Sequence, residues 1–166
     1  MNNNKPEGKL GVLIPGMGAV ATTFIAGIEA IKLGKGSPIG SMTQMGTIRL
    51  GKRTDKKVPL IKDFVPLANL DDLVFGGWDI NEESVYDICI RSNVLEHSTI
   101  NSLKTTLEKI DLWPAVFDKK YVRRLDGTYV KTGKTKMDLA KQVEENITTF
   151  TEKHSTRSNI MIWCGS

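Results

Sequence analysis

The stretch LGVLIPGMGAV, residues 10–20, leads a short apolar run directly into two glycines that are separated by one residue. The run from Lys9 to Pro15 is suited to a buried β-strand, and an amphipathic helix is predicted from Val20 onward. Between them, residues 16–21 (GMGAVA) match the pattern G-x-G-x-x-G/A. This turn either receives the phosphates of a dinucleotide or only packs the helix against the strand.

Each small residue of this pattern has a physical role. Gly16 permits a tight turn, Gly18 lets the backbone approach a pyrophosphate, and Ala21 lets the helix pack closely on the strand. The helix start then directs its free N–H groups at the phosphate charge. The pattern also expects an acid about 20 residues further on to hold the adenosine ribose. Residues 36–41 contain no acid, so the ribose is held from elsewhere or no such cofactor binds.

The remaining apolar runs alternate between strand-like and helix-like segments. Strands are predicted at 73–75, stopping at Gly76-Gly77, and at 160–163, where the run reads as buried. Asp79 or Asn81 is predicted to cap the helix between them. Helical stripes follow at 100–110, capped by Ser98 and closed by Trp113-Pro114, and at 139–150. The stripe after Val20 is Phe24, Ile28 and Ile31.

This order predicts an α/β fold with a doubly wound, mostly parallel, Rossmann-like sheet. We expect a disordered tail over residues 1–8 and an incomplete Rossmann domain over 9–166. The last predicted strand has almost no loop after it, which suggests a chain cut short.

Composition narrows the function classes. A chain of 166 residues with net charge +4 fits one globular domain, and its basic residues are scattered without an aromatic platform. We therefore expect no nucleic-acid partner, and no apolar run is long enough to suggest a membrane span. Cys89 and Cys164 lack metal-ligand spacing and indicate reduced thiols in a cytoplasmic protein. His97 and His154 have no partners at metal-ligand or catalytic-triad spacing and are expected at the surface.

Two further stretches resemble a known family. Residues 40–51 (GSMTQMGTIRLG) and 71–80 (DDLVFGGWDI) resemble the N-terminal part of myo-inositol-phosphate synthases. Family members also have an apolar strand that ends in Trp and a short polar loop, which residues 160–166 resemble. The order and spacing hold from about Lys9 to the last residue. The Gly-Gly-Trp-Asp-Ile element is far more specific than the glycine turn.

The resemblance implies where NAD would bind. Asp79 would hold the adenosine ribose, accept two hydroxyl hydrogen bonds and repel the 2′-phosphate of NADP; the alternative is that it only caps a helix near Asn81. The sugar anchor would then come from a distant Trp-Asp pair instead of the usual neighbouring strand. The implied cofactor contacts are Gly16, Gly18, Ala19, Val20, Ala21, Asp79, Ile80, Cys164, Gly165 and Ser166.

This chain departs from the family at two of those places. Many relatives have Gly-Gly-Asn-Asn where this sequence has Gly-Ala-Val-Ala at 18–21, so only backbone contacts to the pyrophosphate remain. The last loop usually reads Thr-Ala-Asn, which is replaced here by Cys-Gly-Ser at 164–166.

The resemblance also implies an activity. Family members oxidise glucose 6-phosphate with NAD, close the ring through an enolate, and return the hydride to give an inositol monophosphate. Their catalytic lysines and most of their tetramer contacts lie in a second domain, so no catalytic residue and no metal ligand is assigned in this chain. We expect the 166 residues to bind NAD weakly at best, without turnover. Another NAD(P)-dependent oxidoreductase and a non-catalytic nucleotide-binding or scaffold module remain open.

Overall fold

Within residues 7–165, which the structure describes, four parallel strands form a sheet in the order β3-β2-β1-β4. In this computed structural model β1 (Lys9–Pro15) lies between β2 (Leu73–Asp79) and β4 (Thr156–Met161), and β3 (Asp111–Pro114) lies beside β2. The order is that of the first four strands of a Rossmann sheet. The predicted parallel α/β fold is confirmed.

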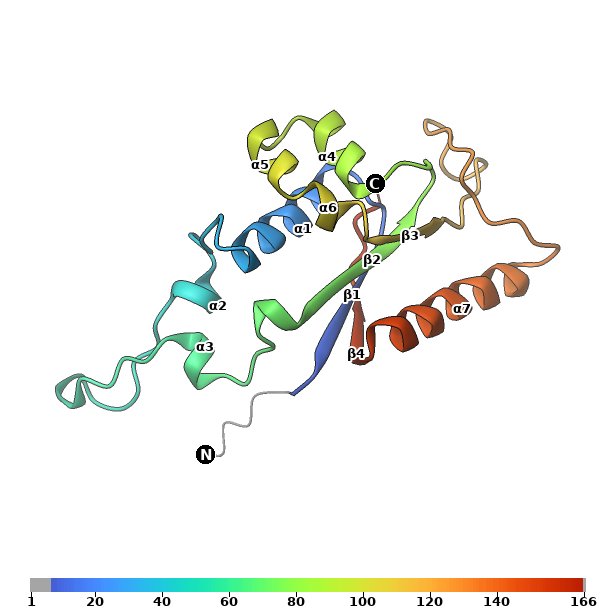
Figure 1. Ribbon diagram of the computed structural model, residues 1–166. Coiled ribbons are helices and arrows are strands. Elements are labelled where there is room, and N and C mark those ends of the chain that lie inside the picture. Colours follow the sequence, from blue (N-terminus) through green and yellow to red (C-terminus); the bar gives the residue numbers. More distant parts are fainter. Residues whose placement is uncertain (1–6, 166) are drawn as a thin grey trace.

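Helices cover both faces of the sheet (Figure 1). One face carries α1 (Ala19–Lys32), α4 (Val85–Ser92), α5 (His97–Ser102) and α6 (Lys104–Leu107), and the other carries α7 (Lys136–His154). The chain runs outward from β1 to β2 to β3 and then crosses back past β1 to β4. Because parallel crossovers are right-handed, this reversal places α7 on the opposite face.

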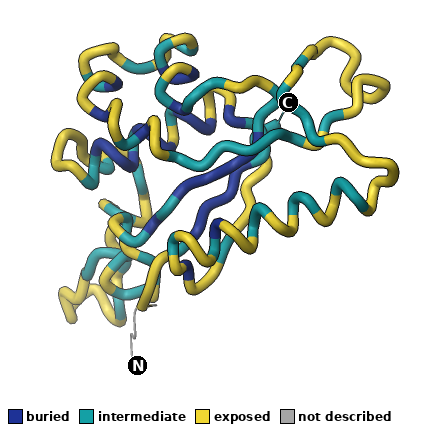
Figure 2. The backbone as a smooth tube through the Cα atoms, turned by 45° about the vertical axis from the view of Figure 1, so that its right-hand side comes forward, coloured by how far each residue is buried: buried dark blue, intermediate teal, exposed yellow. Residues whose placement is uncertain are grey.

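Side chains of β1 alternate between two cores, as a strand's pleat requires. Val12 and Ile14 belong to the larger cluster with α1, α4, α5 and α6, while Leu13 packs with Trp78 and Phe150 under α7. All five of these residues are almost fully buried. Figure 2 shows β1 and β2 as the buried centre of the molecule.

The buried stripe of α1 differs from the one predicted. Ala21, Ile25 and Ile28 face the core, whereas Phe24 is 43% exposed. Phe24 instead places its ring edge-on against Phe75, with centroids 5.9 Å apart at the margin of the core. The small residues Ala21 and Ala26 are almost fully buried and let the helix lie close to the sheet, while Phe24 lies beside this buried face.

Strand β2 does not stop at its glycines, as the sequence suggested. It continues through Gly76 and Gly77 to Asp79. A Cβ on Gly77 would lie 2.2 Å from the Ile14 carbonyl oxygen, and one on Gly76 would lie 3.0 Å from the Phe150 ring. The glycines therefore allow close packing inside the sheet instead of ending the strand.

Three further boundaries correct the sequence prediction. Ser84, not Asp79 or Asn81, caps α4, because its hydroxyl accepts from the Asp87 N–H at 3.1 Å. Helix α5 begins after Glu96, not after Ser98. Trp113 and Pro114 do not close a helix but lie in β3, where register with β2 overrides the helical periodicity.

The ends of β4 and α7 also differ from expectation. The terminal run of β4 was predicted to be buried, yet the sheet edge leaves Ile160 and Met161 44% and 52% exposed. His154, expected at the surface, is 23% exposed, lies 2.7 Å from the Asp111 carboxylate and is tilted against the Phe150 ring. This pair joins the end of α7 to the start of β3.

A long connection separates α1 from β2. It contains α2 (Met42–Met45), α3 (Ile61–Phe64) and two short 3-10 turns, Arg53–Asp55 and Leu70–Asp72. Antiparallel bridges join Thr47 to Leu60 and Leu50 to Lys57, so part of it folds back on itself. In Figure 1 this excursion extends away from the sheet. Across residues 7–165, every helix is too short or too polar to traverse a bilayer.

Candidate functional site

The glycine turn lies at the carboxyl end of β1. Gly16 has φ +89°, a conformation that favours glycine, and its N–H donates to the Trp78 carbonyl oxygen at 2.9 Å. A Cβ on Gly16 would lie 2.5 Å from the Gly165 backbone. The fold itself therefore requires glycine at this position.

Gly18 has a different character. It is the N-cap of α1, with φ −77°, and a Cβ added there would meet nothing within 4 Å. No side chain caps this helix end, and the first residues of α1, Ala19 and Val20, are exposed. The protein's own packing does not need a glycine here, so the missing side chain leaves open space above the helix N-terminus. An anion placed there would meet backbone N–H groups and the positive end of the dipole.

Asp79 lies next to this turn. The parallel register pairs Pro15 with Trp78, which brings the last residue of β2 beside the glycine turn. The Asp79 Oδ2 atom accepts from the Met17 N–H at 2.9 Å, and Oδ1 accepts from the Asn81 N–H at 3.0 Å. The carboxylate is therefore held in place by two backbone donors.

This position corrects the sequence interpretation that the sugar anchor comes from somewhere other than the neighbouring strand. Asp79 ends the strand that adjoins β1, which is where the Rossmann pattern places its ribose-binding acid. The excursion between α1 and β2 delays the acid along the sequence without moving it in the fold. The alternative that Asp79 only caps a helix near Asn81 is wrong, because Ser84 caps α4.

The segment after β4 lies on the other side of the turn. The Cys164 N–H donates to the Pro15 carbonyl oxygen at 2.9 Å, and Gly165 packs against Gly16. Cys164 and Gly165 are thus brought to the glycine turn from the far end of the chain. Ser166, the last of the predicted contacts, lies outside the described residues.

Ile80 is covered by the connection between β3 and α7. Its carbonyl oxygen accepts from the Tyr129 N–H at 2.9 Å, and a Cβ on Gly127 would lie 2.4 Å from the Ile80 Cβ. Burial, and then the charge of Glu82, raise the pKa of Tyr129. Burial lowers the pKa of Lys131 and nearby Glu145 opposes this. The connection therefore packs against Ile80, the residue that follows Asp79.

Sequence reasoning missed two members of this site. Met17 is fully buried and supplies the N–H that binds Asp79. Asn81 donates to Asp79 through its backbone and also through Nδ2, at 3.3 Å. The contact between Asn81 and Asp79 could have been predicted from the sequence, since an Asp that binds the N–H two residues later forms an Asx turn. The contact between Met17 and Asp79 could not, because it depends on the register of β1 and β2.

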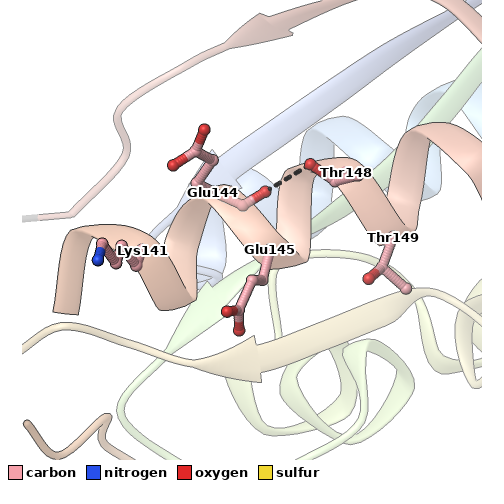
Figure 3. Close-up of a pocket in the computed structure, with 5 residues that line it drawn as sticks. All are labelled: Lys141, Glu144, Glu145, Thr148 and Thr149. Carbon is pink, nitrogen blue, oxygen red and sulfur yellow. Dashed lines mark hydrogen bonds between the residues drawn. The ribbon is translucent and has the colours of Figure 1, made fainter. Parts of the chain in front are cut away.

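Other parts of the described chain are poorer candidates. A shallow groove lies along the exposed face of α7, lined by residues of that helix alone, and the Thr148 hydroxyl within it donates to the Glu144 carbonyl oxygen at 3.0 Å (Figure 3). Among residues 7–165, no group of three His, Cys, Asp or Glu side chains is arranged to hold a metal ion. The turn at Gly16–Gly18 remains the best candidate.

A glycine turn opening a 14-residue helix, with a carboxylate at the end of the adjoining strand, defines a Rossmann dinucleotide-binding domain. A sequence model of an NAD-binding domain, described as "Myo-inositol-1-phosphate synthase", matches residues 10–166. The chain belongs to this family, and its cofactor is NAD.

Individual relatives agree with this assignment. The chain is 40% identical over 160 residues to inositol-3-phosphate synthase 1 of Bacteroides thetaiotaomicron and 30% identical over 169 residues to that of Oryza sativa. These matches cover 96% and 93% of this chain but 37% and 33% of the relatives. The crystal structure of inositol-3-phosphate synthase from Caenorhabditis elegans superposes with a TM-score of 0.84 at 24% identity, covering 97% of this chain and 35% of that one. The chain thus spans about a third of the length of these proteins.

Proposed function

We propose that this chain supplies the cofactor-binding portion of an enzyme that converts glucose 6-phosphate into a myo-inositol monophosphate. The named activity of the relatives, inositol-3-phosphate synthase, supports the reaction class. The observation that carries the proposal is the Asp79 carboxylate, fixed beside the glycine turn by the Met17 N–H.

The residues at the turn fit the ADP half of NAD. A Cβ on Gly18 would meet nothing within 4 Å, which would leave room for a pyrophosphate to approach, and backbone N–H groups at the start of α1 would bind it. Ala19, Val20 and Ala21 have no side-chain hydrogen-bond donors, so these contacts use the backbone alone. Asp79 would accept from the adenosine ribose, and its charge disfavours the 2′-phosphate of NADP.

The division of labour follows from these contacts. NAD, when bound, supplies a hydride acceptor and later a hydride donor. The part of that work done by this chain is to bind and orient the nucleotide between β1, β2 and the segment at Cys164 and Gly165. We assign no catalytic residue here and propose that the sugar phosphate binds to residues outside this sequence. We propose that the complete enzyme is a homotetramer in the cytoplasm.

Isothermal titration of the 166-residue chain with NAD and NADP tests the cofactor role. We expect weak NAD binding, weaker NADP binding, and a higher melting temperature with NAD, since a ligand that binds the folded state stabilises it. Equal affinity for both nucleotides would favour a different NAD(P)-dependent oxidoreductase, and no binding would favour a scaffold module. Incubation with NAD and glucose 6-phosphate should release no inositol phosphate detectable by mass spectrometry.

A further inference from the structure

The Asp79 carboxylate is already engaged at three of its acceptor positions. A carboxylate offers about four lone-pair sites, two on each oxygen. Here Oδ2 accepts from the Met17 N–H at 2.9 Å, while Oδ1 accepts from both the backbone N–H and the side-chain Nδ2 of Asn81, at 3.0 and 3.3 Å. One acceptor position, on Oδ2, is left for a ligand.

This count conflicts with the sequence expectation that Asp79 binds both hydroxyls of a ribose. A cis-diol brings two O–H donors, and Oδ1 has no room for the second while Asn81 holds it. The two backbone donors belong to the glycine turn and to the Asx turn after β2, so they stay in place. Asn81 is exposed, and the hydrogen bond from its carboxamide is the longest of the three. A rotation of the Asn81 side chain can break this bond.

We propose that Asn81 is a positioning residue that determines how many ribose hydroxyls of the cofactor Asp79 binds. Its carboxamide occupies the second acceptor position on Oδ1, so the carboxylate accepts from one ribose hydroxyl and not from two. This inference rests on the proposed function, since it requires NAD to bind at the glycine turn.

The experiment compares NAD with two analogues that lack the 2′- or the 3′-hydroxyl of the adenosine ribose. Dissociation constants are measured by titration calorimetry for the wild type and for Asn81→Ala, which removes the carboxamide and keeps the backbone N–H. In the wild type, one analogue should bind about tenfold more weakly than NAD and the other within about twofold of it, because one charged hydrogen bond is lost in only one of them. In Asn81→Ala, both analogues should lose about tenfold, and NAD itself should bind about threefold more tightly or better.

Asn69→Ala provides the matched control. Asn69 is also exposed and also donates its Nδ2 to a nearby carboxylate, Asp72, at 3.1 Å, but it precedes β2 and lies at the opposite end of that strand from Asp79. Its substitution should leave the wild-type pattern of the two analogues unchanged. Circular dichroism melts of both variants show whether either has lost its fold.

The outcomes separate the two proposals. NAD binding that is equally sensitive to both hydroxyls in the wild type, or insensitive to both, would overturn the role of Asn81, as would an unchanged pattern in Asn81→Ala. Failure of the wild type to bind NAD at all would overturn the proposed function, and the inference with it.

Discussion

The Met17 N–H donates to the Asp79 Oδ2 atom at 2.9 Å, although the two residues are 62 positions apart in the chain. This bond joins the glycine turn after β1 to the end of β2. It occupies the Met17 N–H, so in the proposed function the phosphates would be bound by Gly18 and the first residues of α1. The same carboxylate thus orders the turn and, in the proposed complex with NAD, would present an acceptor to the ribose.

The charge of Asp79 should set the preference for NAD. Asp79→Asn keeps an oxygen that can accept from Met17 but removes the negative charge. We expect NAD affinity to fall about tenfold and NADP affinity to fall less, so that the ratio between them narrows. Titration calorimetry of the two nucleotides measures this ratio. Asp71→Asn, exposed before the start of β2, is the control and should leave the ratio unchanged.

The two glycines of the turn should respond differently to alanine. Gly16→Ala forces a Cβ to within 2.5 Å of Gly165 at φ +89° and should cost about 2 kcal/mol or more in unfolding free energy. Gly18→Ala adds a methyl group to open space and should cost less than about 1 kcal/mol, yet weaken NAD binding. Urea unfolding and NAD titration of both variants separate the effects. The reverse assignment, with Gly18→Ala the less stable protein, would contradict this account of the turn.

Phe150 should be a main contributor to stability. It is fully buried, and its ring fills the space left by Gly11 and Gly76 on the face of the sheet under α7. Phe150→Ala should lower the unfolding free energy by about 3–5 kcal/mol. Thr149→Ala, at an exposed position of the same helix, should change it by less than about 0.5 kcal/mol. Comparable losses in the two variants would show that α7 is not packed as described.

Cys89 should cause the unfolding free energy to decrease at alkaline pH. Burial raises the pKa of the Cys89 thiol above its ordinary value of 9.0, and a hydrogen-bonding interaction with the Thr22 side chain partly offsets this. The folded state therefore keeps the thiol proton more tightly than the unfolded state. The resulting stabilisation is present below pH 9.0 and is lost as the pH rises above it.

The measurement is the unfolding free energy from pH 8 to about pH 10.5, beyond the thiol's ordinary pKa. The slope of its decline should be shallower in Cys89→Ala than in the wild type, whatever the absolute cost of the substitution. In the wild type, a thiol-alkylating reagent should also modify partly exposed Cys164 well before Cys89. Equal labelling of the two cysteines would contradict the burial of Cys89.

Local signals in the sequence were sufficient for several elements. The apolar run of β1, the glycine turn and the stripe along α7 each follow from neighbouring residues alone. The Gly-Gly-Trp-Asp-Ile element was sufficient to indicate the family, which the comparison then confirmed. These features depend on short-range periodicity or on a continuous motif.

Only the tertiary structure decided the rest, because it depends on contacts between distant segments. Gly76 and Gly77 read as a strand end until Ile14 and Phe150 are seen against them. Trp113 and Pro114 read as a helix stop until β2 supplies a pairing register. In the sequence Asp79 lies far from the glycine turn, because the long connection between α1 and β2 intervenes. In the sheet that connection adds no distance between β1 and β2. Strand register brings the Asp79 carboxylate to Met17, and no local pattern encodes that register.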